Sequence, residues 1–178
     1  MNEHVAPPAG FKPRNFTQVI SLFVGAALFI LGACGLLYPA FAGLHLGVLH
    51  SLIISVAGAT LFYHGGWKDN SFYAFISCFF FGSFFGLLGL IGFILGEPGV
   101  PSIGYIRADP HLFVLIKGVA EYGRLDHIMN ALIGIILMGG ALDWQRRGGL
   151  TSYRRQKKIV ERKEKEEKKK ERLRYAHH

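Results

Sequence analysis

The chain has 178 residues, of which 51% are hydrophobic and only 18% are charged, and it contains 23 Gly and 15 Phe. A length of this order predicts one domain, and the composition argues against a water-soluble one, since Gly-rich and Phe-rich sequence is typical of helices that pack closely in lipid. The net charge of +8 lies in the tail: residues 145–178 hold 14 Lys and Arg against 5 Asp and Glu, and the rest has a net charge of −1.

Four apolar stretches follow one another along the chain, at residues 19–37, 46–63, 72–95 and 128–142. The first three have 18 or more residues without a charge, enough to cross the hydrocarbon core of a bilayer, and extension to 127–144 completes the fourth. We therefore expect an all-α fold, a four-helix transmembrane bundle. An N-terminal segment, 1–16, precedes the transmembrane domain, 17–144, and a basic helical tail, 145–178, follows it.

Basic residues outside the spans predict the orientation. Lys12 and Arg14 precede the first span, Lys68 follows the second, and the tail follows the fourth, so both termini are expected in the cytoplasm. Trp67 and Trp144 end spans two and four, where an indole suits the headgroup layer. The start of the chain has no apolar region typical of a cleavable signal, so the first span is expected to direct insertion of a multi-pass protein, in a bacterial inner membrane.

The four spans also show two internal matches. A shift of 57 residues superposes Gly25, Gly32 and Gly35 on Gly82, Gly89 and Gly92, and a shift of 77 superposes His50 on His127 and Trp67 on Trp144. Each half is then a helical hairpin, and an axis along the membrane normal relates the two. Chance matching in Gly-rich apolar sequence is the competing explanation.

The glycines predict where helices meet. Gly25, Gly32 and Gly35 share one helical face, and so do Gly82, Gly86 and Gly89, while Gly92 has small-x-x-x-small spacing with Gly96. We expect these faces to pack spans one and three together at the centre of the bundle; the alternative is a homo-oligomer or docking on a larger membrane complex. Most of the five phenylalanines in 79–85 are expected to face lipid or a neighbouring subunit.

Short motifs carry a family resemblance over residues 17–144. Gly-x-x-Gly occurs at 32–35 and 89–92, a histidine enters the second span at His50, and Asp126 begins a segment that leads to Gly134. In these features the chain resembles DUF4383, a bacterial membrane family of unknown function with two hairpins, a resemblance that implies the fold but no activity. The chain departs from the family at Asn130, where the family has a histidine.

Two histidines near the outer surface are the candidate cofactor ligands. Haem iron takes two axial imidazoles and chlorophyll magnesium one, so His50 and His127 at matched depths would suit either group. The simpler interpretation is that each hydrogen-bonds to a neighbouring helix. His64 follows His50 by about 21 Å along a helix, the spacing of a second haem, but its counterpart in the repeat, Ala141, cannot ligate. The sequence predicts neither a catalytic constellation nor a metal-ion site.

Two further segments lie outside the spans. The outer loop predicts a short amphipathic helix over 111–123, acting as a cap or a docking element. The tail predicts a helix over 153–175 with almost no apolar face, suited to anionic lipid or an acidic protein surface and not to nucleic acid. We therefore expect a non-enzymatic structural or assembly subunit; the alternative is a haem- or chlorophyll-binding subunit of an electron-transfer or photosynthetic complex.

Overall fold

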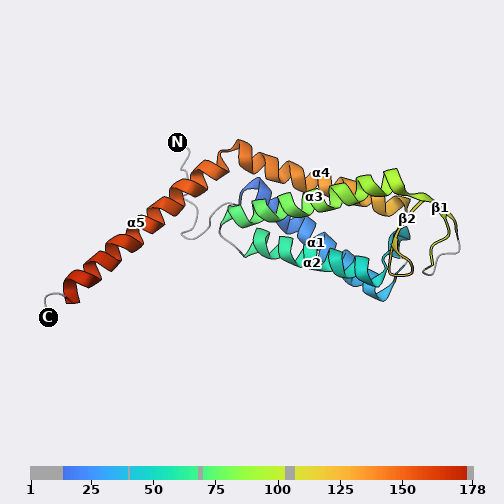
Figure 1. Ribbon diagram of the computed structural model, residues 1–178, viewed down its shortest axis with the longest axis horizontal. Helices are drawn as coiled ribbons and strands as arrows, with labels where there is room; N and C mark the ends of the chain where they lie inside the picture. The colour runs from blue at the N-terminus through green and yellow to red at the C-terminus, as the bar shows by residue number, and fades with distance from the viewer. Residues whose placement is uncertain (1–13, 40, 68–69, 103–106, 176–178) are drawn as a thin grey trace, which may run out of the picture.

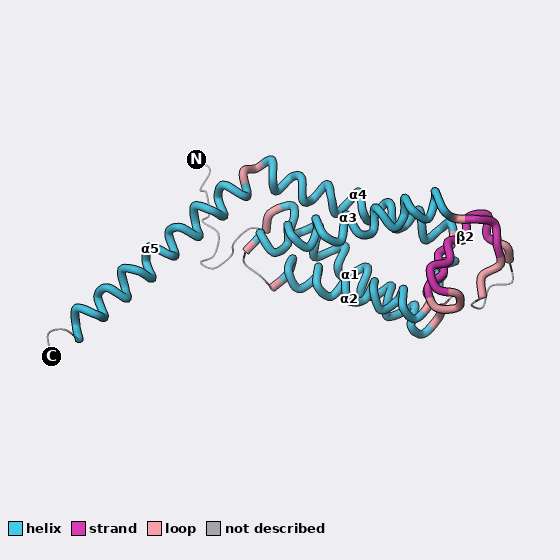
Figure 2. The backbone as a smooth tube through the Cα atoms, in the orientation of Figure 1, coloured by secondary structure: helices cyan, strands magenta, loops and turns pink. Residues whose placement is uncertain are grey.

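The computed structural model describes residues 14–39, 41–67, 70–102 and 107–175. The elements in chain order are α1 (Phe16–Leu37), the 3-10 turn η1 (Phe41–Gly43), α2 (Val48–Gly66), α3 (Ser71–Leu95), β1 (Glu97–Gly99), β2 (Asp109–Ile116), β3 (Ala120–Tyr122), α4 (Arg124–Arg146) and α5 (Gly149–Tyr175). Helices α1 to α4 run side by side, the strands lie at one end of them, and α5 projects beyond the other (Figures 1 and 2).

Each of α1 to α4 is long and apolar enough to cross a membrane, which confirms the four predicted spans at that level. Helices α1 and α3 begin earlier than the apolar stretches because polar caps precede them. Asn15 accepts a hydrogen bond from the backbone N of Gln18 at 2.9 Å, and the Gln18 side chain accepts one from Asn15 N at 3.2 Å. Asn70 caps α3 with a single bond, accepting from the backbone N of Phe72 at 3.0 Å. Lys12 and Lys68, used above for orientation, lie outside the described residues.

The segment 111–123 is not the predicted amphipathic helix. It forms most of a small antiparallel sheet with strand order β1-β2-β3, in which Phe113 stands opposite Tyr122. Branched residues such as Val114 and Ile116 favour a strand, and Gly118 adopts a φ of +75° in the turn between β2 and β3. The apolar pattern therefore came from residues of a hairpin with an exposed tip. Helical spacing alone did not distinguish such a hairpin from an amphipathic helix.

The glycines lie against the other helix of their own pair, not between spans one and three as predicted. A Cβ on Gly25 would stand 2.3 Å from the backbone N of Phe62 in α2, and one on Gly134 of α4 would stand 2.5 Å from the Cα of Gly86 in α3. A separation that short is possible only without a side chain, so backbone meets backbone. Gly25, Gly32 and Gly35 thus pack on α2 and the residues just before it, and Gly82, Gly86, Gly89 and Gly92 pack on α4.

These contacts recur with constant offsets along the chain. Glycine contacts between α1 and α2 have equivalents between α3 and α4. The equivalent contacts are Gly25–Phe62 and Gly82–Met138, Gly32–Ser55 and Gly89–Ala131, and Gly35–Ser51 and Gly92–His127. Each α3 residue follows its α1 counterpart by 57 positions, and each α4 residue follows its α2 counterpart by 76. The same two offsets relate the contacts between the two helix pairs. Ile20 of α1 packs on Gly140 of α4, and the equivalent residues, Ser77 of α3 and His64 of α2, are hydrogen-bonded to each other.

The offset of 76 corrects the predicted alignment of 77 by one residue. The helix contacts make Ser51, not His50, the counterpart of His127, and they make Gly65, not His64, the counterpart of Ala141. A step of one residue turns a helix by about 100°, so the two histidines do not hold equivalent positions.

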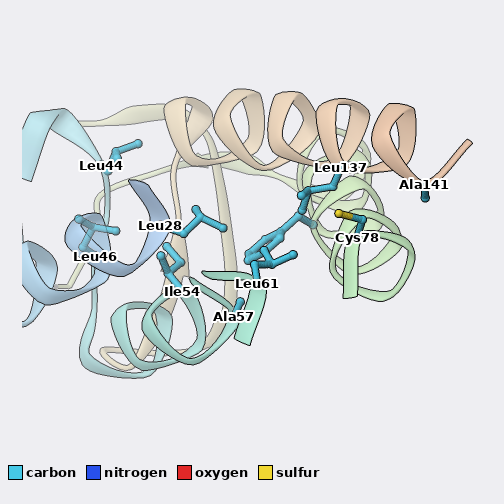
Figure 3. Packing of buried hydrophobic residues seen from close by; sticks show 10 residues of the cluster. Leu28, Leu44, Leu46, Ile54, Ala57, Leu61, Cys78, Leu137 and Ala141 are labelled. Carbon is cyan, nitrogen blue, oxygen red and sulfur yellow. The ribbon is translucent and has the colours of Figure 1, made fainter. Parts of the chain in front are cut away.

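The four helices share one apolar core. Leu28 of α1, Ile54 and Leu61 of α2 and Leu137 of α4 belong to it (Figure 3), as does Phe85 of α3. All five side chains are at most 2% exposed. The core gives each helix one face directed toward its neighbours.

The opposite faces are apolar but uncovered by this chain. Phe79 and Phe80 are 51% and 61% exposed, as the sequence predicted for a lipid-facing surface, while Phe85 is buried. The two tryptophans differ as well: Trp67 is 72% exposed, but Trp144 is only 5% exposed, so the Trp144 indole is covered by the protein.

A glycine pair within α4 tests the backbone contact. Gly134→Ala places a methyl group against Gly86, whereas Gly139→Ala meets nothing within 4 Å. We expect Gly134→Ala to lower the free energy of unfolding by roughly 1–3 kcal/mol, the typical cost of overpacking, and Gly139→Ala to leave it almost unchanged. Thermal unfolding in detergent micelles measures both. Equal stability of the two variants would contradict the contact.

Candidate functional site

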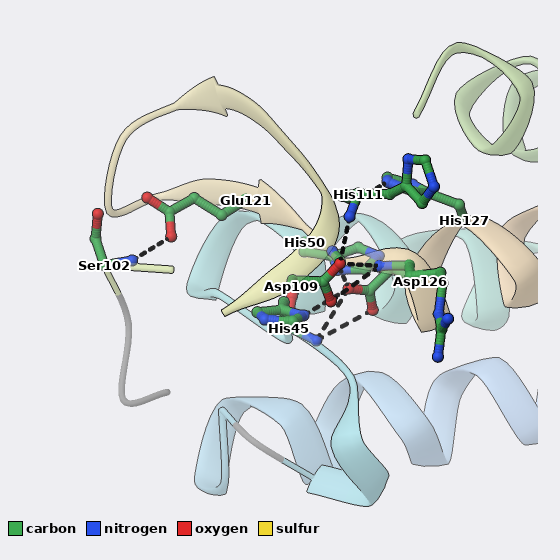
Figure 4. Close-up of polar contacts among 10 residues, drawn as sticks. His45, His50, Ser102, Asp109, His111, Glu121, Asp126 and His127 are labelled. Atoms are coloured by element: carbon green, nitrogen blue, oxygen red, sulfur yellow. Dashed lines mark hydrogen bonds and ion pairs between the residues drawn. The ribbon is translucent and has the colours of Figure 1, made fainter. Parts of the chain in front are cut away.

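The Asp126 carboxylate is the centre of a polar cluster at the sheet end of the helices (Figure 4). It is fully buried and accepts hydrogen bonds from the backbone N of Gly123 at 2.7 Å and from the backbone N of His45 at 3.1 Å. The His45 ring adds a third contact, with Nδ1 3.1 Å from Oδ2. One carboxylate therefore caps α4 and holds the connection between α1 and α2, 81 residues away in sequence.

His50 and His127 hold the sheet to the helices. Nδ1 of His50 donates to the carbonyl of His45 at 3.0 Å, and its ring meets the Tyr122 ring edge-on at a centroid distance of 4.6 Å. Nε2 of His127 donates to the carbonyl of His111 in β2 at 2.9 Å. Each histidine lies in the first turn of its helix, so the sheet rests directly on the ends of α2 and α4.

Two more carboxylates bind backbone amides in the sheet. Asp109 accepts from the backbone N of His111 at 2.9 Å and of Arg124 at 3.2 Å. Glu121, only 2% exposed, accepts from Ser102 N at 2.7 Å and Gly118 N at 2.8 Å. Together with Asp126, these side chains use their charge to order loops.

Burial alone would raise the pKa of Glu121, but the hydrogen bonds from Gly118 and Ser102 outweigh it and lower that pKa below its ordinary value. For Tyr122, burial first and the nearby Asp126 charge second raise the pKa, so the phenol stays neutral beside His50. The polar cluster at the sheet end thus holds an ionised carboxylate and a neutral phenol at neutral pH.

The candidate ligands do not fit a haem or a chlorophyll. Axial ligation needs an imidazole nitrogen facing open space, but His50 and His127 are both 0% exposed. His127 uses Nε2 for the sheet and turns Nδ1 against the α3 backbone, where a Cβ on Gly92 would overlap it. His64 belongs to the opposite end of α2, where its ring hydrogen-bonds to Ser77 of α3 at 2.5 Å. Across the described ranges, no three His, Cys, Asp or Glu side chains are grouped to hold a metal ion.

A second polar and aromatic arrangement, which we call the α5 joint, lies at the opposite end. Nε1 of Trp144 donates to Ser71 Oγ at 3.0 Å, and its ring stacks on Phe75 at a centroid distance of 4.3 Å. Tyr153 of α5 stacks on Phe72 at 4.0 Å with an interplanar angle of 13°. Gly148 turns the chain with a φ of +71° between α4 and α5. The start of α5 is therefore packed on α3 and α4.

A polar cavity of about 270 Å³ adjoins the α5 joint. Its walls include the caps of α1 and α3, Asn15 and Asn70, together with Tyr153 and the ion pair of Arg147 with Asp143, whose Nε and Oδ2 lie 2.9 Å apart. Because Arg147 already faces a carboxylate, the cavity is not strongly basic.

Sequence reasoning found part of this geometry. It named His50 and His127 either as ligands of a cofactor or, more simply, as hydrogen-bonded to a neighbouring helix, and in the structure each donates to a backbone carbonyl outside the helices. It overlooked His45, Asp109 and Glu121, which act through backbone amides brought together by the fold. The one local signal is the Gly-x-x-Asp spacing of Gly123 and Asp126, which is that of a capping carboxylate at the third helical position.

Comparison with protein-family models, curated proteins and solved structures gives no match to this chain. The resemblance to DUF4383 therefore stays a prediction.

Asp126 is the first target for mutation. Asp126→Ala removes every hydrogen bond to the carboxylate and leaves buried amides of Gly123 and His45 unpaired, so we expect a loss of roughly 2–5 kcal/mol in the free energy of unfolding. His45→Ala keeps the backbone bond and should cost clearly less. Unfolding in detergent micelles provides the comparison, and an equal or larger loss for His45→Ala would contradict the role of Asp126 as the centre.

Glu121 predicts a pH dependence. Its folded pKa is lowered, so its stabilising contribution is complete above the ordinary value of 4.5 and is lost as the pH falls from there through the folded pKa. At pH 7 we expect Glu121→Gln to unfold at a lower temperature than the wild type. The two should converge in acid, below pH 4.5. A difference independent of pH would show that ionisation of Glu121 is not responsible.

Proposed function

We propose that this protein is an integral membrane subunit whose role is assembly or interaction, and that it presents α5 to a partner from a transmembrane four-helix bundle. The bundle consists of two tandem hairpins, α1–α2 and α3–α4, related by rotation about an axis along the membrane normal. The repeated glycine contacts and the matching contacts between pairs support this arrangement. Four membrane-length helices with exposed apolar faces support residence in the bilayer.

The orientation follows from charge. The basic α5 projects from the end where the chain enters α1, and Arg14 at that end donates to the carbonyl of Gly66 at 3.0 Å. Residues 96–126 at the sheet end hold three basic and four acidic residues. Because basic residues concentrate on the cytoplasmic side, we place both termini in the cytoplasm and the sheet outside.

The observation that carries the proposed role is the α5 joint. A tail that only reinforced orientation would need positive charge and no fixed geometry. Instead, stacking of Tyr153 on Phe72 and contact of Gly149 with the Trp144 ring hold the start of α5 against the bundle. A highly charged helix held in this manner presents a defined surface to the cytoplasm.

The charge along α5 changes with distance from the joint. Arg154, Arg155, Lys157 and Lys158 near the joint are all exposed and basic, which suits the anionic lipids of the inner leaflet. Beyond them, basic and acidic residues alternate, with Glu161, Glu166 and Glu167 exposed. We assign the first part to lipid headgroups and the mixed part to a protein partner with an acidic surface.

The role is proposed to be non-enzymatic. The buried carboxylates at the outer end accept hydrogen bonds from backbone amides, and His50 and His127 each donate to a backbone carbonyl. Such groups order the fold and are not positioned to meet a substrate. Because His50 and His127 have no open coordination face, the geometry does not favour the haem or chlorophyll alternative.

The test compares the size of the assembly in native membranes. We expect the full chain, extracted in mild detergent, to migrate in a larger complex on a native gel. Tyr153→Ala, which removes the stacking on Phe72, should reduce that complex severalfold, and Tyr153→Phe, which keeps the ring, should preserve it. High salt should weaken the complex as well, because a contact between exposed charges is screened.

Deletion of residues 148–178 is the decisive variant. It should leave the four helices in the membrane and abolish the larger complex. If the complex keeps its size without α5, the partner binds elsewhere and the proposed role of α5 is wrong.

A further inference from the structure

The tip of the β2–β3 hairpin carries an apolar surface outside the helices. Val114, Leu115, Ile116 and Val119 are 45%, 60%, 49% and 42% exposed. Successive residues of a strand point to opposite faces, so exposure of three in a row means that the described residues cover neither face of the tip. A cluster of large aliphatic side chains outside any core is typical of an interaction surface.

The depth of the tip follows from its contacts. β3 lies on the first turn of α2, where the Tyr122 and His50 rings meet at 4.6 Å, and β2 lies on the first turn of α4 through His111 and His127. Helix α2 has 19 residues and so spans about 28 Å, close to the thickness of the hydrocarbon core. Its first turn therefore lies at the boundary between acyl chains and headgroups, and the hairpin, lying across the helix ends in Figure 2, shares that depth.

The helix surface at this end of the molecule is also apolar. Leu37, Tyr38 and Val48, at the outer ends of α1 and α2, are 75%, 67% and 64% exposed. The tip extends this lipid-facing surface into the headgroup layer and adds one exposed cation, Lys117, between Ile116 and the turn at Gly118. Aliphatic side chains beside a lysine suit a lipid interface, where the chains meet acyl carbon and the ammonium meets phosphate.

We propose that the β2–β3 tip, residues 114–119, inserts into the outer leaflet of the membrane and anchors the sheet at the level of the lipid glycerol and phosphate groups. The occupant of this surface is the lipid itself, not another protein. The inference depends on the membrane orientation proposed above, and it assigns a second lipid contact in addition to the helices.

Site-directed spin labelling tests the depth. Leu115→Cys, in a chain with Cys34→Ala and Cys78→Ala, is labelled and reconstituted in vesicles of phosphatidylcholine and phosphatidylglycerol. We expect the label to be several-fold more accessible to oxygen, relative to a water-soluble nickel complex, than a label at Glu97→Cys. Glu97 is the matched control, because it is exposed and charged on β1 of the same sheet. Val119→Cys repeats the measurement if the first variant folds poorly.

A label at Phe80→Cys, on the exposed face of α3, separates the two proposals. If position 80 is not in lipid, the proposed placement of the four helices in the membrane itself fails. If position 80 is in lipid and positions 115 and 119 resemble Glu97, the tip lies in water and only this inference is overturned. Low accessibility of position 115 to both reagents would show a protein contact in place of lipid, and would overturn it as well.

Discussion

The approach of helix backbones at glycine is the constraint on which the rest of the structure depends. Gly25 against Phe62 and Gly134 against Gly86 leave no space for a Cβ, so each helix pair has one possible register. In lipid there is little hydrophobic force between helices, and close van der Waals contact is what holds them together. Once these registers are set, the core residues Leu28, Ile54 and Leu137 face a common interior, and the start of α4 lies beside the residues just before α2.

Adjacent helix ends explain why the polar groups lie where they do. The start of α4 and the connection before α2 lie side by side, so one carboxylate, Asp126, reaches the amides of Gly123 and His45. At the other end, Trp144 reaches Ser71 and stacks beside the aromatic residues that receive α5. Polar contacts thus join the pairs at the two ends, where water and headgroups lower the cost of a polar group, while the middle is joined by apolar side chains.

The sequence predicted the helices well and their partners poorly. Uninterrupted apolar length determines whether a segment can cross a membrane, and that property is local, so four spans were readable from residues alone. A glycine stripe marks a close contact but does not name the helix that fills it, which is why Gly25 and Gly82 were assigned to each other instead of to α2 and α4. The small sheet was missed because three short strands have no periodic signal as strong as that of a helix. Glu121 and Asp109 were missed because they act on amides brought near only by the fold.

The one-residue correction to the internal alignment changes how the two halves are understood. With an offset of 76, His50 corresponds to Asp126, and His64 corresponds to Gly140. At both positions one half carries an imidazole and the other does not. At both, the residue also makes a contact beyond its own helix pair: Asp126 with His45, and His64 with Ser77. The halves are therefore alike where glycine brings backbones together within each helix pair. They differ where the two helix pairs meet, because Ile20 packs on Gly140 at the position where Ser77 hydrogen-bonds to His64.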